Sequence, residues 1–311
     1  MSDIENALQE YLSTRRTLGF ELREAGSLLT QFLHFLEKEN ASFITTDLAL
    51  KWSTLDENSQ PATWASRLAV VRIFAQFYNA LDPRNEIPPQ GLLPFRYHRK
   101  QPYIYNDIEI SRLLEASSHL ESDIGLRAST YFTLFGLLTV TGMRINEPIA
   151  LDLCDVDLTQ NILTVRRTKF GKSRLIPIHS STAGMLEKYS RLRDRLLPCK
   201  KSSGFFLSEK GKRLTEWAVR WTFVKLSREI GLRAPNDSHG PRIHDLRHAF
   251  TVKTLIKWYQ TGVDVERHMP ELAAYLGHTH VNDTYWYISA VPELLSLASS
   301  RLTRIYREGL S

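Results

Sequence analysis

The sequence of 311 residues is poor in cysteine, with only Cys154 and Cys199. Two thiols allow neither a disulfide framework nor a four-thiolate zinc site, and we expect a reducing, cytoplasmic compartment. No apolar run approaches the roughly 18–20 residues needed to span a bilayer, and the first residues lack the basic start and apolar stretch of a secretory signal. We therefore expect no membrane association. A nucleotide-binding loop of the Gly-x-x-x-x-Gly-Lys type is also missing.

The composition is that of a globular protein, with 42% hydrophobic and 24% charged residues. The length suits about two domains. Residues 161–260 contain 22 Lys and Arg against 7 Asp and Glu, whereas residues 101–160 contain 3 against 9. A basic block in a chain that is otherwise neutral or acidic predicts a surface that binds a polyanion. The alternative is a solvated, cation-rich face.

We predict a mainly α-helical protein (α+β) in two parts. Residues 1–82 form a helical bundle, and residues 83–102 form an extended linker rich in proline, which blocks helix propagation. Residues 103–311 form a mostly helical domain with a small antiparallel β-sheet, whose hairpin covers residues 161–178. An amphipathic tail helix is expected over residues 292–306. Further helices are predicted by apolar spacing over residues 29–36, 45–52, 64–78 and 131–140, from about 180, and over 215–230.

Two cationic side chains lie at predicted structural junctions. Arg144, in the segment Thr141-Gly-Met-Arg-Ile-Asn-Glu147, enters at the start of a helix, where free amides and the helix dipole favour an anion. Lys169 lies on the shoulder of the hairpin, from which a lysine can protonate a leaving oxygen as general acid. Lys172 is its rival, but the Lys-x-x-Lys-x-Arg arrangement favours Lys169. Taken singly, each is typical of a surface cation.

A second cationic segment is Pro241-Arg-Ile-His-Asp-Leu-Arg-His248. His244 and Arg247 are three residues apart, so on a helix they share a face and can contact one phosphate. His244 and His248 are four apart, which is also a spacing for metal ligands. A zinc site would need a third ligand, such as His278 or His280. No Glu lies beside the histidine pair as a zinc hydrolase requires, so we expect no metal.

A tyrosine follows the segment Tyr275-Leu-Gly-His278. Tyr287 lies nine residues after His278, within Asp283-Thr-Tyr-Trp-Tyr-Ile-Ser289. A tyrosine can act as nucleophile in phosphoryl chemistry if neighbouring cations stabilise the phenolate and the transition state. Tyr285 is the alternative nucleophile, and the spacing from His278 favours Tyr287. Aromatic rings at this density are also typical of packing.

In combination, these segments closely resemble the boxes of the tyrosine recombinase, or phage integrase, family. The boxes are "TGMRINE", a hairpin lysine, "HDLRHAF", "LGH" and a tyrosine nine residues after that histidine. The resemblance covers essentially the whole chain and implies an amino-terminal helical DNA-binding domain before the catalytic domain. Pro148 departs from the family pattern, in which an aliphatic residue is common, so we expect the helix there to start late or bend.

The resemblance also implies a role for each residue. Tyr287 attacks the scissile DNA phosphate and leaves a 3′-phosphotyrosine and a free 5′-hydroxyl. The other implied catalytic residues are Arg144 and Arg247, which hold the non-bridging oxygens, Lys169, which protonates the 5′-oxygen, His244, which assists proton transfer, and His278, which hydrogen-bonds the phosphate. The covalent link stores the bond energy, so neither ATP nor a metal or other cofactor is implied.

The implied function is site-specific breakage and rejoining of double-stranded DNA, which integrates, excises or transposes a mobile element. The resemblance also implies a homo-tetramer on DNA, in which the tail helix docks on the neighbouring subunit, and accessory proteins that bend DNA or set directionality. The alternative is that the tail caps its own domain. Two alternatives remain: a type IB topoisomerase, which relaxes supercoils without exchanging strands, and a non-catalytic DNA-binding protein with the same fold. The target sequence is not encoded in any pattern that we identify.

Overall fold

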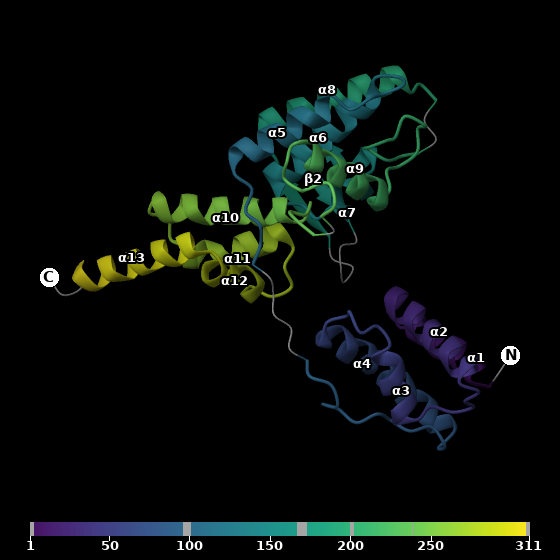
Figure 1. Cartoon of the computed structure of the whole chain (residues 1–311). Coiled ribbons are helices and arrows are strands. Elements are labelled where there is room, and N and C mark those ends of the chain that lie inside the picture. The colour runs from purple at the N-terminus through teal and green to yellow at the C-terminus, as the bar shows by residue number, and fades with distance from the viewer. Residues whose placement is uncertain (1–2, 96–100, 167–172, 200–201, 238, 309–311) are drawn as a thin grey trace. The chain divides into compact units, whose positions relative to one another are not determined.

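The computed structural model describes residues 3–95, 101–166, 173–199, 202–237 and 239–308, with side chains as far as residue 303. The chain divides into two compact units, residues 1–100 and 101–311 (Figure 1), and each is described by itself. Among the described helices, none combines the length and apolar character needed to cross a bilayer.

The first unit is a bundle of four helices. They are α1 (Asp3–Thr17), α2 (Arg23–Lys38), α3 (Thr46–Ser53) and α4 (Pro61–Leu81). The predicted helices over residues 29–36, 45–52 and 64–78 are confirmed. Thr45 caps α3 by accepting the Leu48 amide at 3.2 Å, and Pro61 begins α4 where its missing amide is not needed. The core is aromatic, with Phe32, Trp52 and Phe74 almost fully buried.

The proline-rich segment, expected to act as a linker from residue 83, contacts α4 over part of its length. Arg72 of α4 donates to the carbonyls of Pro88 and Pro89, both at 2.7 Å. The Asn85 side chain accepts the Ile44 amide at 2.8 Å. Residues 85–89 are therefore held against the helical bundle.

The second unit is mostly helical, with a small antiparallel sheet of order β1-β2-β3, which confirms the predicted fold class. Its elements are α5 (Asp107–Ser118), α6 (Leu126–Thr141), α7 (Asn146–Ala150), the 3-10 helix η1 (Leu153–Asp155), β1 (Val156–Asp157), β2 (Ile162–Val165), β3 (Arg174–Pro177), α8 (Ser180–Leu196), α9 (Glu216–Glu229), α10 (Asp245–Gln260), α11 (Val265–Leu276), α12 (Asn282–Ala290) and α13 (Pro292–Glu308). Strands β2 and β3 form the predicted hairpin, with Val165 opposite Arg174. The short strand β1 was not predicted.

Two helix ends shape the region where the predicted site residues meet. Helix α6 ends at Gly142 and α11 ends at Gly277, both in the left-handed conformation that glycine adopts without strain (φ 60° and 69°). Helix α10 packs against α6 and α13 (Figure 1). Pro148 lies in the first turn of α7, where an amide donor is not required, and α7 is only 5 residues long.

Candidate active site

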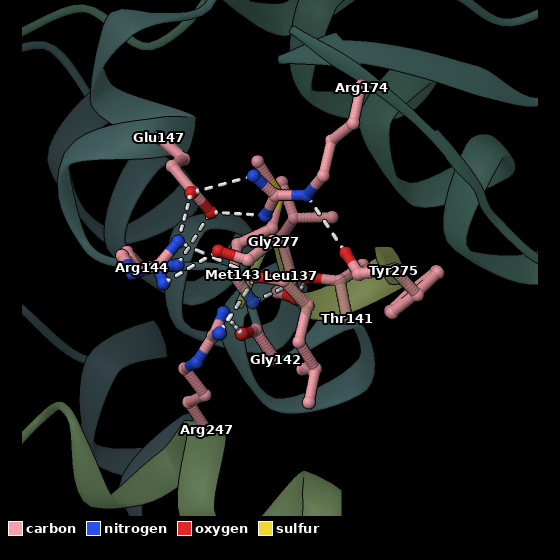
Figure 2. Close-up of polar contacts among 11 residues, drawn as sticks. Leu137, Thr141, Gly142, Met143, Arg144, Glu147, Arg174, Arg247, Tyr275 and Gly277 are labelled. Carbon is pink, nitrogen blue, oxygen red and sulfur yellow. Dashed lines mark hydrogen bonds and ion pairs between the residues drawn. The ribbon is translucent and has the colours of Figure 1, made fainter. Parts of the chain in front are cut away.

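Two arginines from distant parts of the chain converge at the end of α11. Arg144, between α6 and α7, donates to the Leu276 carbonyl at 3.5 Å and to the Gly277 carbonyl at 2.9 Å (Figure 2). Arg247, on α10, donates to the same Leu276 carbonyl at 2.7 Å and to the Gly142 carbonyl at 2.8 Å. Because they share one carbonyl, the two guanidinium groups lie side by side.

Glu147 lies beside this pair and binds a third arginine. Its carboxylate accepts two bonds from Arg174 at 2.9 and 2.8 Å, and two from Arg144, through the amide at 2.8 Å and through Nη1 at 3.2 Å (Figure 2). Burial alone raises the pKa of the Glu147 carboxyl, but the hydrogen bonds and charge of Arg174, joined by the Arg144 amide, hold that pKa below its ordinary value. The carboxylate is therefore ionised at neutral pH.

Burial also lowers the pKa of two predicted site residues, Arg247 on α10 and His244, which directly precedes that helix. It lowers the pKa of Arg247 to about 10, with the nearby charge of Arg144 acting in the same direction. Arg247 still carries its charge at neutral pH. Burial and the positive charge of Arg247 lower the pKa of His244 to about 4, so its imidazole is neutral at pH 7.

Tyr287 lies on α12 and is buried, with 1% of its surface exposed. Its hydroxyl is 2.5 Å from Nδ1 of His248 on α10. The His248 ring in turn packs edge-on against His244, with 4.9 Å between ring centroids. Tyr285, the alternative nucleophile, is 39% exposed on the same helix. Of the two tyrosines, Tyr287 is therefore the one that contacts His248 of α10.

His278 follows directly after Gly277, so it begins where the two arginines are anchored. Its Nδ1 lies 2.7 Å from the Thr284 hydroxyl on α12, which fixes the orientation of the ring. Lys169 and its rival Lys172 lie outside the described residues. Within the described part of the chain, no group of three His, Cys, Asp or Glu side chains is arranged to hold a metal ion.

Three features of this region were not predicted from the sequence: the roles of Glu147 and Arg174, and the contact of His248 with Tyr287. A signal existed for two of them. Glu147 is three residues after Arg144, a spacing that permits an ion pair on one helical turn. Arg174 is two residues before the buried Ile176, and alternate residues of a strand share a face. Nothing in the sequence pattern pointed to the contact between His248 and Tyr287.

The helical unit, its three-stranded sheet and this cluster of arginine, histidine and tyrosine define the class of tyrosine recombinase catalytic domains. Residues 105–293 match the model of the phage integrase family. The chain is 47% identical to y4rB of Sinorhizobium fredii, which is named as an integrase/recombinase, over 99% of both proteins. It is 30% identical to the tyrosine recombinase XerD of Staphylococcus haemolyticus, over 76% of this chain and 74% of that protein.

Solved structures share the fold. The Tn1549 transposon integrase in complex with circular intermediate DNA matches with a TM-score of 0.66 and 16% identity, covering 96% of this chain and 99% of the other. A lambda integrase dimer bound to a core site matches with a TM-score of 0.58 and 14% identity, covering 89% and 95%. The match of residues 105–293 to the family model and the 47% identity to y4rB show that the chain belongs to the phage integrase family of tyrosine recombinases.

Proposed function

We propose that this chain is a site-specific DNA recombinase that cuts and rejoins strands through a 3′-phosphotyrosine on Tyr287, and that it moves a mobile DNA element. The observation that carries the proposal is the pair of guanidinium groups on the Leu276 carbonyl, from Arg144 and Arg247. Two adjacent guanidinium groups form a site for the two non-bridging oxygens of one phosphate. His278 lies two residues after Leu276 in the chain.

The proposed reaction replaces one phosphodiester bond by another. The Tyr287 oxygen attacks the phosphorus and its proton passes to a histidine, while the bond from phosphorus to the 5′-oxygen breaks. Lys169 gives its proton to that 5′-oxygen. The arginines stabilise the additional negative charge of the phosphorane-like transition state. A 5′-hydroxyl of another strand then attacks the phosphotyrosine and restores the free tyrosine.

The bond energy stays in the phosphotyrosine, so the exchange needs neither ATP nor a metal ion. His244 is neutral at pH 7 because its pKa is lowered to about 4, and it can therefore accept a proton. In the described structure the histidine on the Tyr287 hydroxyl is His248, with His244 beyond it. We propose that His244 accepts the tyrosine proton once Tyr287 has left its contact with His248.

Burial of Tyr287 adds a step before the chemistry. A phenol that is 1% exposed and bonded to His248 cannot reach a phosphate on a duplex. Binding of DNA must therefore break this contact and displace the tyrosine before attack. The cost of that displacement is part of the barrier to the first cleavage.

The partner is double-stranded DNA, supported by the basic block and by an exposed face of α9. Trp217 and Trp221 are 74% and 51% exposed there, with Arg220 between them.

We further propose a homo-tetramer on DNA. Helix α13 packs on α10 and α12 of its own chain but leaves Leu295 and Leu302 more than half exposed, and a neighbouring subunit covers this stripe.

Covalent trapping tests the proposal. Wild type, Tyr287→Phe and Tyr285→Phe are incubated with nicked duplexes taken from DNA around the gene, denatured in SDS, and the protein-linked strands are sequenced. We expect an adduct in wild type and in Tyr285→Phe, and none in Tyr287→Phe. An adduct that survives in Tyr287→Phe and is lost in Tyr285→Phe assigns the chemistry to Tyr285. DNA binding without an adduct in any protein contradicts the proposed activity.

A further inference from the structure

Arg174 is a partly buried cation to which the proposed chemistry gives no role. It is the first residue of β3, and its side chain is 12% exposed. Two of its nitrogens donate to the Glu147 carboxylate, and Nε donates to the Tyr275 carbonyl at 2.8 Å (Figure 2). Each nitrogen of the guanidinium therefore donates to the protein itself.

Arg144 is anchored on a carboxylate and on the turn at the end of α11, and Arg174 binds the carboxylate and a carbonyl beside that turn. The first anchor is the Glu147 carboxylate, which Arg174 binds in a bidentate manner. The second is the turn that presents the carbonyls of Leu276 and Gly277, directly after the Tyr275 carbonyl that Arg174 also binds. The orientation of Arg144 therefore depends on two groups that one neighbouring guanidinium keeps in place.

The turn at the end of α11 is fitted closely around Arg174. A Cβ atom at Gly277 would lie 2.8 Å from Nη1 of Arg174 and 3.0 Å from its central carbon, and the backbone φ of Gly277 is +69°. Glycine is thus required at this position by its backbone conformation and by the space that Arg174 occupies. The same turn leads directly to His278.

We propose that Arg174 is a positioning residue for the proposed strand cleavage. It does not contact the phosphate. It fixes Arg144 through Glu147 and fixes the turn that leads to His278. It also connects Arg144 and this turn to the β2–β3 hairpin, in whose sequence Lys169 lies. This inference rests on the proposed function, because it names the residue that holds the proposed catalytic side chains Arg144 and His278 in position.

The chemistry of the guanidinium explains why arginine is needed here. Its planar fork donates in two parallel directions to a carboxylate and in a third direction from Nε, whereas lysine donates from a single nitrogen. Lysine at this position keeps the charge but cannot hold Glu147 and the Tyr275 carbonyl together. Displacement of a catalytic group by about 1 Å can cost about 100-fold in rate.

Single-turnover cleavage of a nicked duplex tests the role. We expect the rate at saturating enzyme to fall about 10- to 100-fold in Arg174→Gln, and less in Arg174→Lys, with DNA affinity unchanged in both. The matched control is Arg191→Gln on α8, which removes an exposed arginine from an ion pair with Glu187 and leaves the rate unchanged. The fraction of molecules that forms adduct at long times is measured as well. If only that fraction falls while the rate constant is unchanged, Arg174 merely stabilises the fold and the proposal is wrong.

A second measurement does not depend on activity. In protein with labelled arginine, the guanidinium NMR signals of Arg144, assigned with Arg144→Lys, report whether this side chain is held. We expect hindered rotation of the Arg144 guanidinium in wild type and in Arg191→Gln, and averaged signals in Arg174→Gln. Unchanged Arg144 signals in Arg174→Gln overturn the inference. If wild type forms no adduct, the proposed function fails, and the Arg144 signals still decide whether Arg174 positions it.

Discussion

The substitution Glu147→Gln removes the charge at the centre of the arginine cluster. The carboxylate accepts four hydrogen bonds, two from Arg174 and two from Arg144, and its side chain is 7% exposed. Glutamine keeps one acceptor oxygen and places an amide donor against guanidinium donors. Breaking a buried pair by neutralising one partner costs about 3–5 kcal/mol. The arginines retain other partners, so we expect a loss of about 3 kcal/mol, or about 6–12 °C in the melting temperature of a domain of this size.

Differential scanning calorimetry measures this shift in the transition of the unit formed by residues 101–311. The matched control is Glu187→Gln, which neutralises an exposed carboxylate paired with Arg191 and is expected to cost less than about 1 kcal/mol. The pKa of Glu147 is lowered, so its contribution is complete above the unfolded pKa of about 4.3 and is lost as the pH falls through the folded value. The difference between wild type and Glu147→Gln should therefore begin to shrink as the pH falls below about 4.3. Equal shifts for both substitutions at pH 7 would refute this account of the cluster.

Three further results are expected. His244 should titrate near pH 4 in an NMR experiment assigned with His244→Asn, and a titration above pH 6 contradicts the burial argument. The folded state should also lose stability as the pH falls from about 6.5 toward 4, because the imidazole of the unfolded chain binds its proton first. Tyr287→Phe should lower the free energy of unfolding, measured in urea, by about 1 kcal/mol, because His248 loses its hydrogen bond to the hydroxyl. An unchanged free energy of unfolding would show that this bond contributes nothing. Gly277→Ala should lower both the melting temperature and the cleavage rate, because its Cβ displaces Arg174; a normal rate would mean that the turn adapts without moving Arg144.

The sequence by itself determined several helices, among them α4, α6 and α9, together with the hairpin and the family resemblance, whereas α1, α5, α11 and α12 were not predicted. Apolar spacing and caps act within a few residues, so a helix such as α4 or α9 is encoded where it forms. The motifs around Arg144, His244 and Tyr287 are short segments of the same kind, and their order was sufficient for the family resemblance that the comparisons then confirmed.

The tertiary structure alone decided which of these groups meet. Arg144 reaches the Leu276 carbonyl across 132 residues of sequence, Arg174 reaches Tyr275 across 101, and His248 reaches Tyr287 across 39. Local periodicity carries no information about such distances, because they are set by how α6, α10, α11 and α12 pack. The same packing buries Tyr287 and brings Arg174 to Glu147. Local pattern therefore encodes the presence of the proposed catalytic residues, while the burial of Tyr287 and the support of Arg144 exist only in the packed domain.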